Sequence, residues 1–324
     1  MKRNRKPVVP ADDRREFLRY VATAGLLAGL SGCSSRKDGV VGIRMNGSDT
    51  MVNLAQAWAE RYHRVEPMVE IQVLGAGSGV GIADLVDGKC DLANSSRPMK
   101  KKEFDSVVAA HGGIEPVGHI VGHDAMALYI HRDNPVKTLS LEQLAEIYGN
   151  HPTITHWSQL TNRPAQEFFA GRSDEIIPIA RQNSSGTYSY FRDVAIGNDA
   201  DGKKRDYRLG TVDANGSKDV VALVSRSPVA IGYSGMGYKI DEVDWIALSK
   251  ETGQMAYEPS LENAKNGKYP ITRPLIIYTV GELDVMTASG KFLEWIVSEE
   301  GQNLVTLLGY VPIERREAVK HDFA

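Results

Sequence analysis

Residues 176–187 read Ile176-Ile177-Pro178-Ile179-Ala180-Arg181-Gln182-Asn183-Ser184-Ser185-Gly186-Thr187. The apolar half predicts a buried strand, and residues 188–196 predict a helix directly after the polar half. A strand that ends in this way directs free backbone N–H groups, the positive end of a helix and a guanidinium toward one point. The stretch therefore favours an oxyanion site, although the same residues also suit an ordinary serine or threonine cap on a surface helix.

Three earlier stretches have the same order of apolar run, small polar turn and helix. Residues 40–45, 69–74 and 90–93 are predicted strands, and the turns after them are Asn46-Gly47-Ser48-Asp49-Thr50, Gly75-Ala76-Gly77-Ser78-Gly79 and Asn94-Ser95-Ser96-Arg97-Pro98. Taken singly, the first turn is better explained by Ser48 or Asp49 capping a helix. Together, the turns indicate an α/β sheet with a ligand at the carboxyl ends of its strands.

The glycine-rich turn at residues 75–81 differs from a dinucleotide-binding fingerprint. Its glycine spacing is wrong, and no acidic residue stands about 20 residues further on at the end of a second strand. We interpret these glycines as permitting close backbone approach and positive φ.

The second half of the chain continues the α/β pattern. Predicted strands cover residues 122–130, 228–233 and 270–278, and predicted helices cover residues 140–148, 216–224, 289–297 and 301–308. Residues 162–172 and 198–207 are polar and irregular, so we expect surface loops there.

The N-terminus predicts an export signal rather than part of the fold. Arg14 and Arg15 precede an apolar run of about ten residues, shorter than the roughly 20 needed to span a bilayer. The paired arginines resemble a twin-arginine signal, and the small residues before Cys33 resemble a lipoprotein cleavage box, with a polar tether after it. An uncleaved N-terminal membrane anchor is the alternative.

Composition excludes several classes of function. The chain has 324 residues and a formal net charge of −3 without a basic stripe, which argues against a nucleic-acid partner. Cys33 and Cys90 are its two cysteines, so no disulfide framework and no zinc spacing can be drawn, and we expect Cys90 to be buried beside a strand. No metal site, cofactor site or catalytic residue is predicted, because Ser185 has no evident base and acidic residues do not cluster.

Six motifs follow one another along the chain: Gly47-Ser48-Asp49-Thr50, Gly75-Ala76-Gly77-Ser78-Gly79, Asp91-Leu92-Ala93-Asn94-Ser95-Ser96-Arg97-Pro98, Arg181 with Ser185-Gly186-Thr187, Ala230-Ile231-Gly232-Tyr233, and Tyr269-Pro270 to Tyr278. In this order they resemble the phosphate-binding protein of the phosphate ABC transporter, the PstS type. The resemblance covers residues 40–313.

The resemblance implies an α/β, two-lobed type II periplasmic-binding-protein fold. Each lobe is expected to be a mostly parallel sheet flanked by helices, with two crossing strands between the lobes. Residues 1–39 would be signal and tether, residues 40–122 plus 274–324 the first lobe, and residues 123–273 the second. The implied function is an extracytoplasmic, lipid-tethered, monomeric receptor, not an enzyme, that captures inorganic phosphate and delivers it to the permease subunits of an ABC transporter.

The resemblance also implies the ligand contacts, residue by residue. They are Ser48, Thr50 and Met51 in the first loop, Ser78 in the second, Ser96 and Arg97 in the third, and Arg181, Ser185, Gly186 and Thr187 in the loop from the other lobe.

This sequence departs from the family pattern at Ser96, where some members carry a carboxylate that accepts the proton of hydrogen phosphate. We hypothesise that Asp124, at the start of the first crossing strand, is the acceptor, with Asp49 as second choice; either also suits a structural cap. The hydroxyl at Ser96 leaves another oxyanion open, namely sulfate, molybdate or tungstate. A phosphatase on the same scaffold and a purely sensory role are further alternatives.

Overall fold

The computed structural model describes residues 39–161, 169, 173–199, 201–319, 321 and 323. The predicted twin-arginine signal, Cys33 and most of the tether lie outside these residues, as does most of the connection predicted at 162–172. Val41–Ala324 forms one compact unit of the chain.

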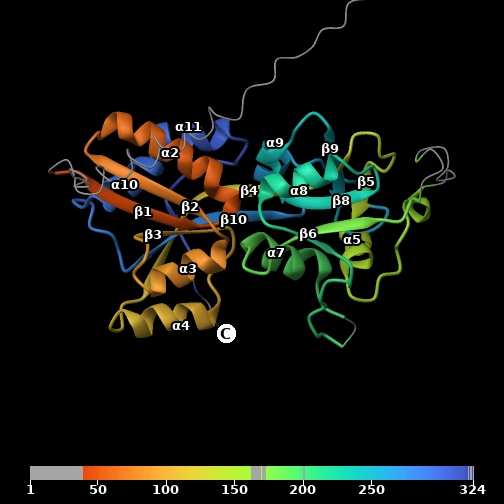
Figure 1. Ribbon diagram of the computed structural model, residues 1–324, viewed down its shortest axis with the longest axis horizontal. Helices are drawn as coiled ribbons and strands as arrows, with labels where there is room; N and C mark the ends of the chain where they lie inside the picture. Colours follow the sequence, from red (N-terminus) through yellow and green to blue (C-terminus); the bar gives the residue numbers. More distant parts are fainter. Residues whose placement is uncertain are drawn as a thin grey trace, which may run out of the picture. The chain divides into compact units, whose positions relative to one another are not determined.

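This unit has two lobes, each with its own hydrophobic core, on either side of a pair of long strands (Figure 1). The first lobe contains β1 (Val41–Gly47), η1 (Asp49–Met51), α2 (Val52–Val65), β2 (Val69–Gly75), α3 (Ser78–Val86), β3 (Leu92–Ser95), α4 (Lys101–Ala110), α10 (Ala288–Ile296), α11 (Glu299–Leu307) and β11 (Glu317–Ala318). The second contains β5 (Thr138–Ser140), α5 (Leu141–Tyr148), η2 (Trp157–Leu160), β6 (Ile177–Arg181), α7 (Gly186–Phe191), η3 (Arg192–Ile196), β7 (Val212–Ala214), α8 (Ser217–Val224), β8 (Ala230–Gly235), η4 (Met236–Tyr238), β9 (Val243–Ser249) and α9 (Leu261–Lys265).

The same strand order occurs in both lobes. β1 pairs in parallel with β2 on one side and β3 on the other, and β6 pairs in parallel with β7 and β8 in the same way. In such an order, successive strands are added first on one side and then on the other side of β1 or β6. A crevice therefore opens at the carboxyl ends of the strands at this switch point. The loops after β1, β3 and β6 therefore start at the two crevices.

The long strands β4 (Pro116–His131) and β10 (Thr272–Val280) cross between the lobes. They pair antiparallel from Pro116–Val280 to Ala125–Thr272, and β10 also joins the first sheet through β3. From Met126 onward β4 pairs with β8 and β9 of the second lobe. The predicted strand at residues 122–130 is thus the second half of β4, and the lobe boundaries at residues 122 and 274 stay a prediction.

Packing explains where the sequence pattern was incomplete. The strand predicted at residues 90–93 lies two residues later, at β3, and Cys90 is buried in front of it as expected. Four strands were missed: β5, β7 and β11 have only two or three residues each, too few for a period-two pattern, while β9 is recognisable only by its pairing with β4 and β5. Within the described ranges, no helix combines the length and apolar character needed to cross a membrane.

Candidate functional site

The loops at the two crevices face each other and touch. The amide N–H of Gly79 in the first lobe donates to the carbonyl oxygen of Ser184 in the second, at 3.0 Å. Gly77 has φ +98°, and a Cβ there would lie 2.8 Å from the same oxygen, so glycine is required for this approach. A Cβ on Gly186 would overlap Ser78 Oγ and lie 2.8 Å from Ser96 Oγ. The glycine-rich turn therefore serves contact between the lobes.

Hydroxyl groups from both lobes converge beside Gly186. Thr50 Oγ1 and Thr187 Oγ1 are 2.9 Å apart across the interface, and Ser96 N donates to Ser78 Oγ at 3.1 Å. All four side chains are almost completely buried. The arrangement provides neutral donors from two lobes around one point, as the sequence motifs predicted.

Arg273 on β10 is a candidate site residue that the sequence analysis missed. Its fully buried guanidinium donates to Thr187 Oγ1 at 2.9 Å, Thr50 Oγ1 at 3.1 Å and the Ser96 carbonyl at 3.4 Å. The available signal was a charge inside an otherwise apolar strand, because such a charge needs a partner when it is buried. Arg273 thus lies at the centre of the hydroxyl cluster.

The partner of Arg273 is Asp124, which is also fully buried. Arg273 Nε and Nη2 donate to Asp124 Oδ2 at 3.0 and 2.8 Å. Within the part of the chain that the structure describes, Asp124 Oδ1 has no hydrogen-bond partner. Burial raises the pKa of Asp124 above its usual value, and the Arg273 charge opposes that shift. A buried acceptor oxygen is therefore left beside a set of donors, and Gly235 keeps side-chain bulk away from it.

Arg181 is buried next to this cluster and links the lobes. Its Nη2 donates to Asp49 Oδ2 at 2.8 Å in the first lobe, and its Nη1 donates to Ser217 Oγ at 3.1 Å in the second. Burial lowers the pKa of Arg181 and raises that of Asp49, while the attraction between their charges opposes both shifts. Asp49, second choice as proton acceptor, is therefore engaged by Arg181 in this structure.

The remaining predicted residues have structural partners. Arg97 donates to both carboxylate oxygens of Glu103, at 2.8 and 2.7 Å. Ser185 Oγ caps α7 by accepting hydrogen bonds from Thr187 N and Tyr188 N. Met51 packs in the hydrophobic core of the first lobe. Ser48 is buried, and its N–H donates to the Asn94 carbonyl at 2.9 Å. Whether each of these residues contacts a ligand stays a prediction.

Comparison with known proteins agrees with this geometry. A family model described as a PBP superfamily domain matches residues 32–300. The phosphate-binding protein PstS of Pseudomonas aeruginosa is 35% identical over 290 residues, which cover 85% of this chain and 84% of that protein. The chain belongs to the PstS family of phosphate-binding proteins.

Two further relatives support membership of the PstS family. PstS of Bacillus subtilis is 29% identical over 84% of this chain and 80% of its own. A substrate-binding protein assigned to a phosphate ABC transporter of Clostridium perfringens, solved with bound phosphate, is 27% identical with a TM-score of 0.70, covering 85% of this chain and 100% of that one. The resemblance and the two-lobed α/β fold class expected for a PstS-type protein are confirmed.

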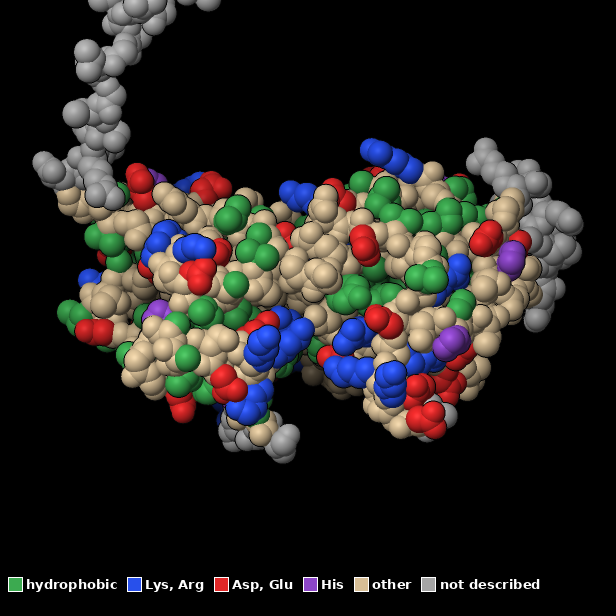
Figure 2. Space-filling view, turned by 60° about the horizontal axis from the view of Figure 1, so that its bottom comes forward, with side chains coloured by type: hydrophobic (Ala, Val, Ile, Leu, Met, Phe, Trp, Pro, Cys, Tyr) green, Lys and Arg blue, Asp and Glu red, His purple; other side chains and the backbone are tan. Residues whose placement is uncertain are grey.

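Basic side chains lie on both sides of the interface between the lobes on one face of this PstS-family protein. Figure 2 shows lysine and arginine side chains gathered on both sides of the boundary. Lys100 precedes α4, and its pKa is lowered by burial and then by neighbouring Arg97, with Arg192 and Asp193 of the second lobe also in reach. Such a rim raises the local concentration of anions.

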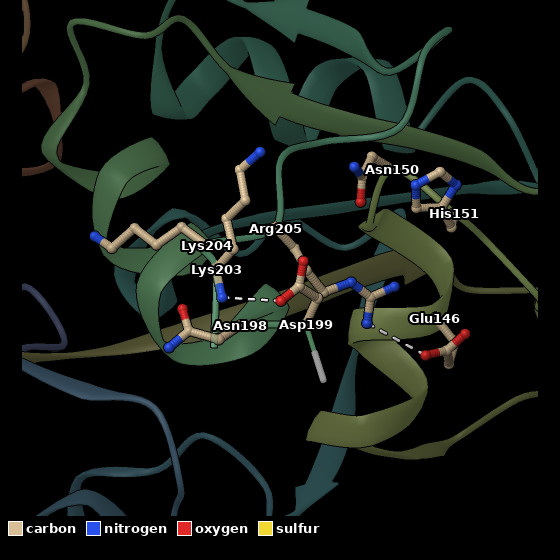
Figure 3. A pocket seen from close by; sticks show the side chains of 8 residues that line it. All are labelled: Glu146, Asn150, His151, Asn198, Asp199, Lys203, Lys204 and Arg205. Carbon is tan, nitrogen blue, oxygen red and sulfur yellow. Dashed lines mark hydrogen bonds and ion pairs between the residues drawn. The ribbon is translucent and has the colours of Figure 1, made fainter. Parts of the chain in front are cut away.

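A separate cavity of about 430 Å³ lies in the second lobe, between α5 and the loop that contains Asn198 and Arg205 (Figure 3). Its carboxylates have structural roles. Asp199 Oδ1 accepts from the Lys203 amide at 2.8 Å, and Glu146 accepts from Arg205 at 3.3 Å. None of the predicted site residues lines it, so the interlobe cluster is the better candidate in the PstS family context.

Proposed function

We propose that this protein captures inorganic phosphate between its two lobes and delivers it to an ABC transporter. The observation that carries the proposal is the buried set of hydroxyl, amide and guanidinium donors around Asp124 Oδ1, an oxygen that has no hydrogen-bond partner among the described residues. Membership of the PstS family supports the same ligand, as do the names of the relatives in Pseudomonas aeruginosa and Bacillus subtilis.

Enough donors are available to bind a dehydrated anion. Each neutral hydrogen bond contributes roughly 1 kcal/mol and each guanidinium bond to an ionised oxygen roughly 1.5–3 kcal/mol. Several such bonds offset the large cost of removing phosphate from water. We assign the donors to Thr50, Ser78, Ser96, Gly186, Thr187, Arg181 and Arg273, with Ser48, Met51, Arg97 and Ser185 in the surrounding loops.

Asp124 would distinguish phosphate from sulfate. Hydrogen phosphate carries a proton that Asp124 Oδ1 can accept, whereas sulfate is fully ionised and would bring an oxygen lone pair against the carboxylate. Leaving a buried hydrogen-bonding group without a partner costs about 1–3 kcal/mol, and more for charged groups. Asp124 therefore replaces the carboxylate that some family members carry at the position of Ser96.

Binding is coupled to closure of the lobes about β4 and β10. The anion contacts groups from both lobes, so it binds the closed state more tightly and shifts the population toward it. The chain is a receptor and not an enzyme in this proposal. Supporting this, Ser185 Oγ at the start of α7 serves as a helix cap and accepts two backbone N–H groups.

The proposal extends to cellular context. We infer a monomer on the outer face of a bacterial membrane, held by lipid on Cys33 after twin-arginine export, that docks on permease subunits. Replacing Cys33 by serine should release the protein from the membrane fraction of an expressing cell. A protein that stays in that fraction would contradict the lipid anchor.

Calorimetric titration of the protein without residues 1–33 tests the ligand directly. We expect phosphate to bind more tightly than sulfate, arsenate or molybdate; preference for sulfate or molybdate over phosphate would overturn the proposal. Asp124→Asn should reduce the discrimination between phosphate and sulfate. The matched control is Asp244→Asn, on the surface of β9, which should leave it unchanged. If Asp124→Asn distinguishes phosphate from sulfate as well as the wild type does, Asp124 is not the acceptor of the phosphate proton.

A further inference from the structure

A cavity of about 620 Å³ lies on the other side of the crossing strands from the candidate phosphate site. Side chains alternate between the two faces of a strand. Asp124 and Arg273 point toward the phosphate site, so their chain neighbours His123 and Thr272 point away from it. Both neighbours line this cavity, which we call the hinge cavity.

The two walls of the hinge cavity are held mainly by different lobes. One wall comes from α9 and Asn266, and Ala264 of α9 packs in the core of the second lobe. The other wall is the C-terminal segment from Val311 to Glu317. Within that segment, Ile313 is held to the first lobe, because its N–H donates to Gln302 Oε1 of α11 at 3.0 Å, and Glu317 pairs with Ile120 of β4, whereas Val311 packs in the core of the second lobe.

The ion pair that bridges the two walls is weak. Lys265 of the second lobe forms an ion pair with Glu314 of the first at 2.8 Å, but both side chains are well exposed, at 61% and 75%. An exposed pair of this kind contributes little to stability. In Figure 1, α9 and α11 lie above the crossing strands, and α3 and α7, which carry the site loops, lie below them. The hinge axis therefore runs between the phosphate site and the hinge cavity.

We propose that the width of the hinge cavity sets the balance between the open and closed lobes, and through it the affinity for phosphate. Rotation about β4 and β10 that brings Gly79 and Ser184 together must move the two cavity walls apart. Rotation that separates the site loops must bring the walls together. In this structure the site loops touch, and the hinge cavity has a volume of about 620 Å³.

Bulk placed in the hinge cavity therefore opposes opening. A protein whose binding-competent state is partly populated binds with an apparent affinity reduced by that fraction. Filling the cavity raises the closed fraction before phosphate arrives, so affinity rises although no residue that touches phosphate has changed. The expected gain in phosphate affinity rests on the proposed function. The expected shift toward the closed lobes does not, because lobe closure can be measured without ligand.

The test places an indole in the cavity from each wall. Asn266→Trp fills it from the second lobe and Arg315→Trp from the first; both residues are exposed cavity-lining positions whose side chains lie outside the two cores. The control is Met255→Trp, an exposed position of the second lobe outside the cavity. Phosphate affinity is measured by calorimetry, and the radius of gyration without ligand by small-angle X-ray scattering.

We expect both variants to bind phosphate about three- to tenfold more tightly than the control and to have a smaller ligand-free radius of gyration. Equal or weaker binding with an unchanged radius of gyration in both variants would overturn the proposal. If the unmodified protein binds no phosphate, the proposed function fails, and the radius of gyration alone then decides whether the cavity controls closure. Circular dichroism confirms that each variant is folded.

Discussion

Gly186→Ala should separate folding from phosphate binding, since its added methyl group lies between the lobes. Gly186 opens α7 in the second lobe without a positive φ, so alanine fits its backbone. Replacing glycine by alanine at a compatible position stabilises a fold by about 0.4–1 kcal/mol. In the closed state, however, the new Cβ would overlap Ser78 Oγ and lie 2.8 Å from Ser96 Oγ in the first lobe, below the 3.0 Å that real contacts observe.

The loss of affinity follows from the contacts that the displacement breaks. Separating the loops weakens the Thr50–Thr187 hydroxyl bond of 2.9 Å and the bond of 2.9 Å from Arg273 to Thr187. One neutral and one charged hydrogen bond together contribute about 2.5–4 kcal/mol. At about 1.4 kcal/mol per tenfold change, phosphate affinity should fall roughly 50- to 800-fold.

Calorimetric titration with phosphate and urea unfolding without ligand measure the two effects on the same samples. Gly42→Ala is the matched control, because a Cβ there meets nothing within 4 Å and its φ is not positive. The expected pattern is weaker binding with equal or greater stability for Gly186→Ala, and no change in affinity for Gly42→Ala. Wild-type affinity in Gly186→Ala would refute the reasoning, since the lobes of the phosphate-bound protein would then not approach each other as closely as they do in this structure.

Three further predictions concern buried groups. Arg273→Met should cost about 3–5 kcal/mol of stability in urea unfolding, because it leaves Asp124 buried without its partner, and adding Asp124→Asn should recover part of this; a loss below 1 kcal/mol would contradict the pairing. Burial lowers the pKa of His119 and His123 in the folded protein. As pH falls, the unfolded state therefore binds more protons than the folded state does. Stability should therefore fall as pH drops below about 6.5, less steeply in His119→Gln, and equal slopes would argue against this origin. Burial raises the pKa of Cys90 to about 12. In protein without Cys33, it should resist iodoacetamide at pH 8 until urea is added, and rapid labelling of the folded protein would contradict its burial.

Local chemistry explains why much of the site was predictable. A strand followed by a polar turn and a helix is a pattern of neighbours, and it identified the loops at Thr50, Ser78, Ser96 and Thr187 that the structure brings together. The glycines at residues 75–79 correctly indicated close backbone approach, although the partner, the Ser184 carbonyl, lies over 100 residues away.

Pairing between distant charges was not predictable in the same way. Arg273 and Asp124 are separated by 149 residues, and each lies in a strand whose pattern indicates only burial. Arg181 was expected to contact the ligand, and the structure adds Asp49 from the other lobe as its partner. No local pattern records such pairs, because the cost of burying each charge is offset by a group that only the fold brings near.

The sequence by itself determined the alternation of strands and helices, the loops that carry small polar residues and the resemblance to the PstS type. These depend on side-chain periodicity and on turn chemistry between neighbours. Only the tertiary structure decided that Arg273 lies at the centre of the candidate site, that one oxygen of Asp124 has no hydrogen-bond partner among the described residues, and that a second cavity lies behind the crossing strands. Each of these depends on the register of β4 against β10, which fixes which side chains of the two strands share a face.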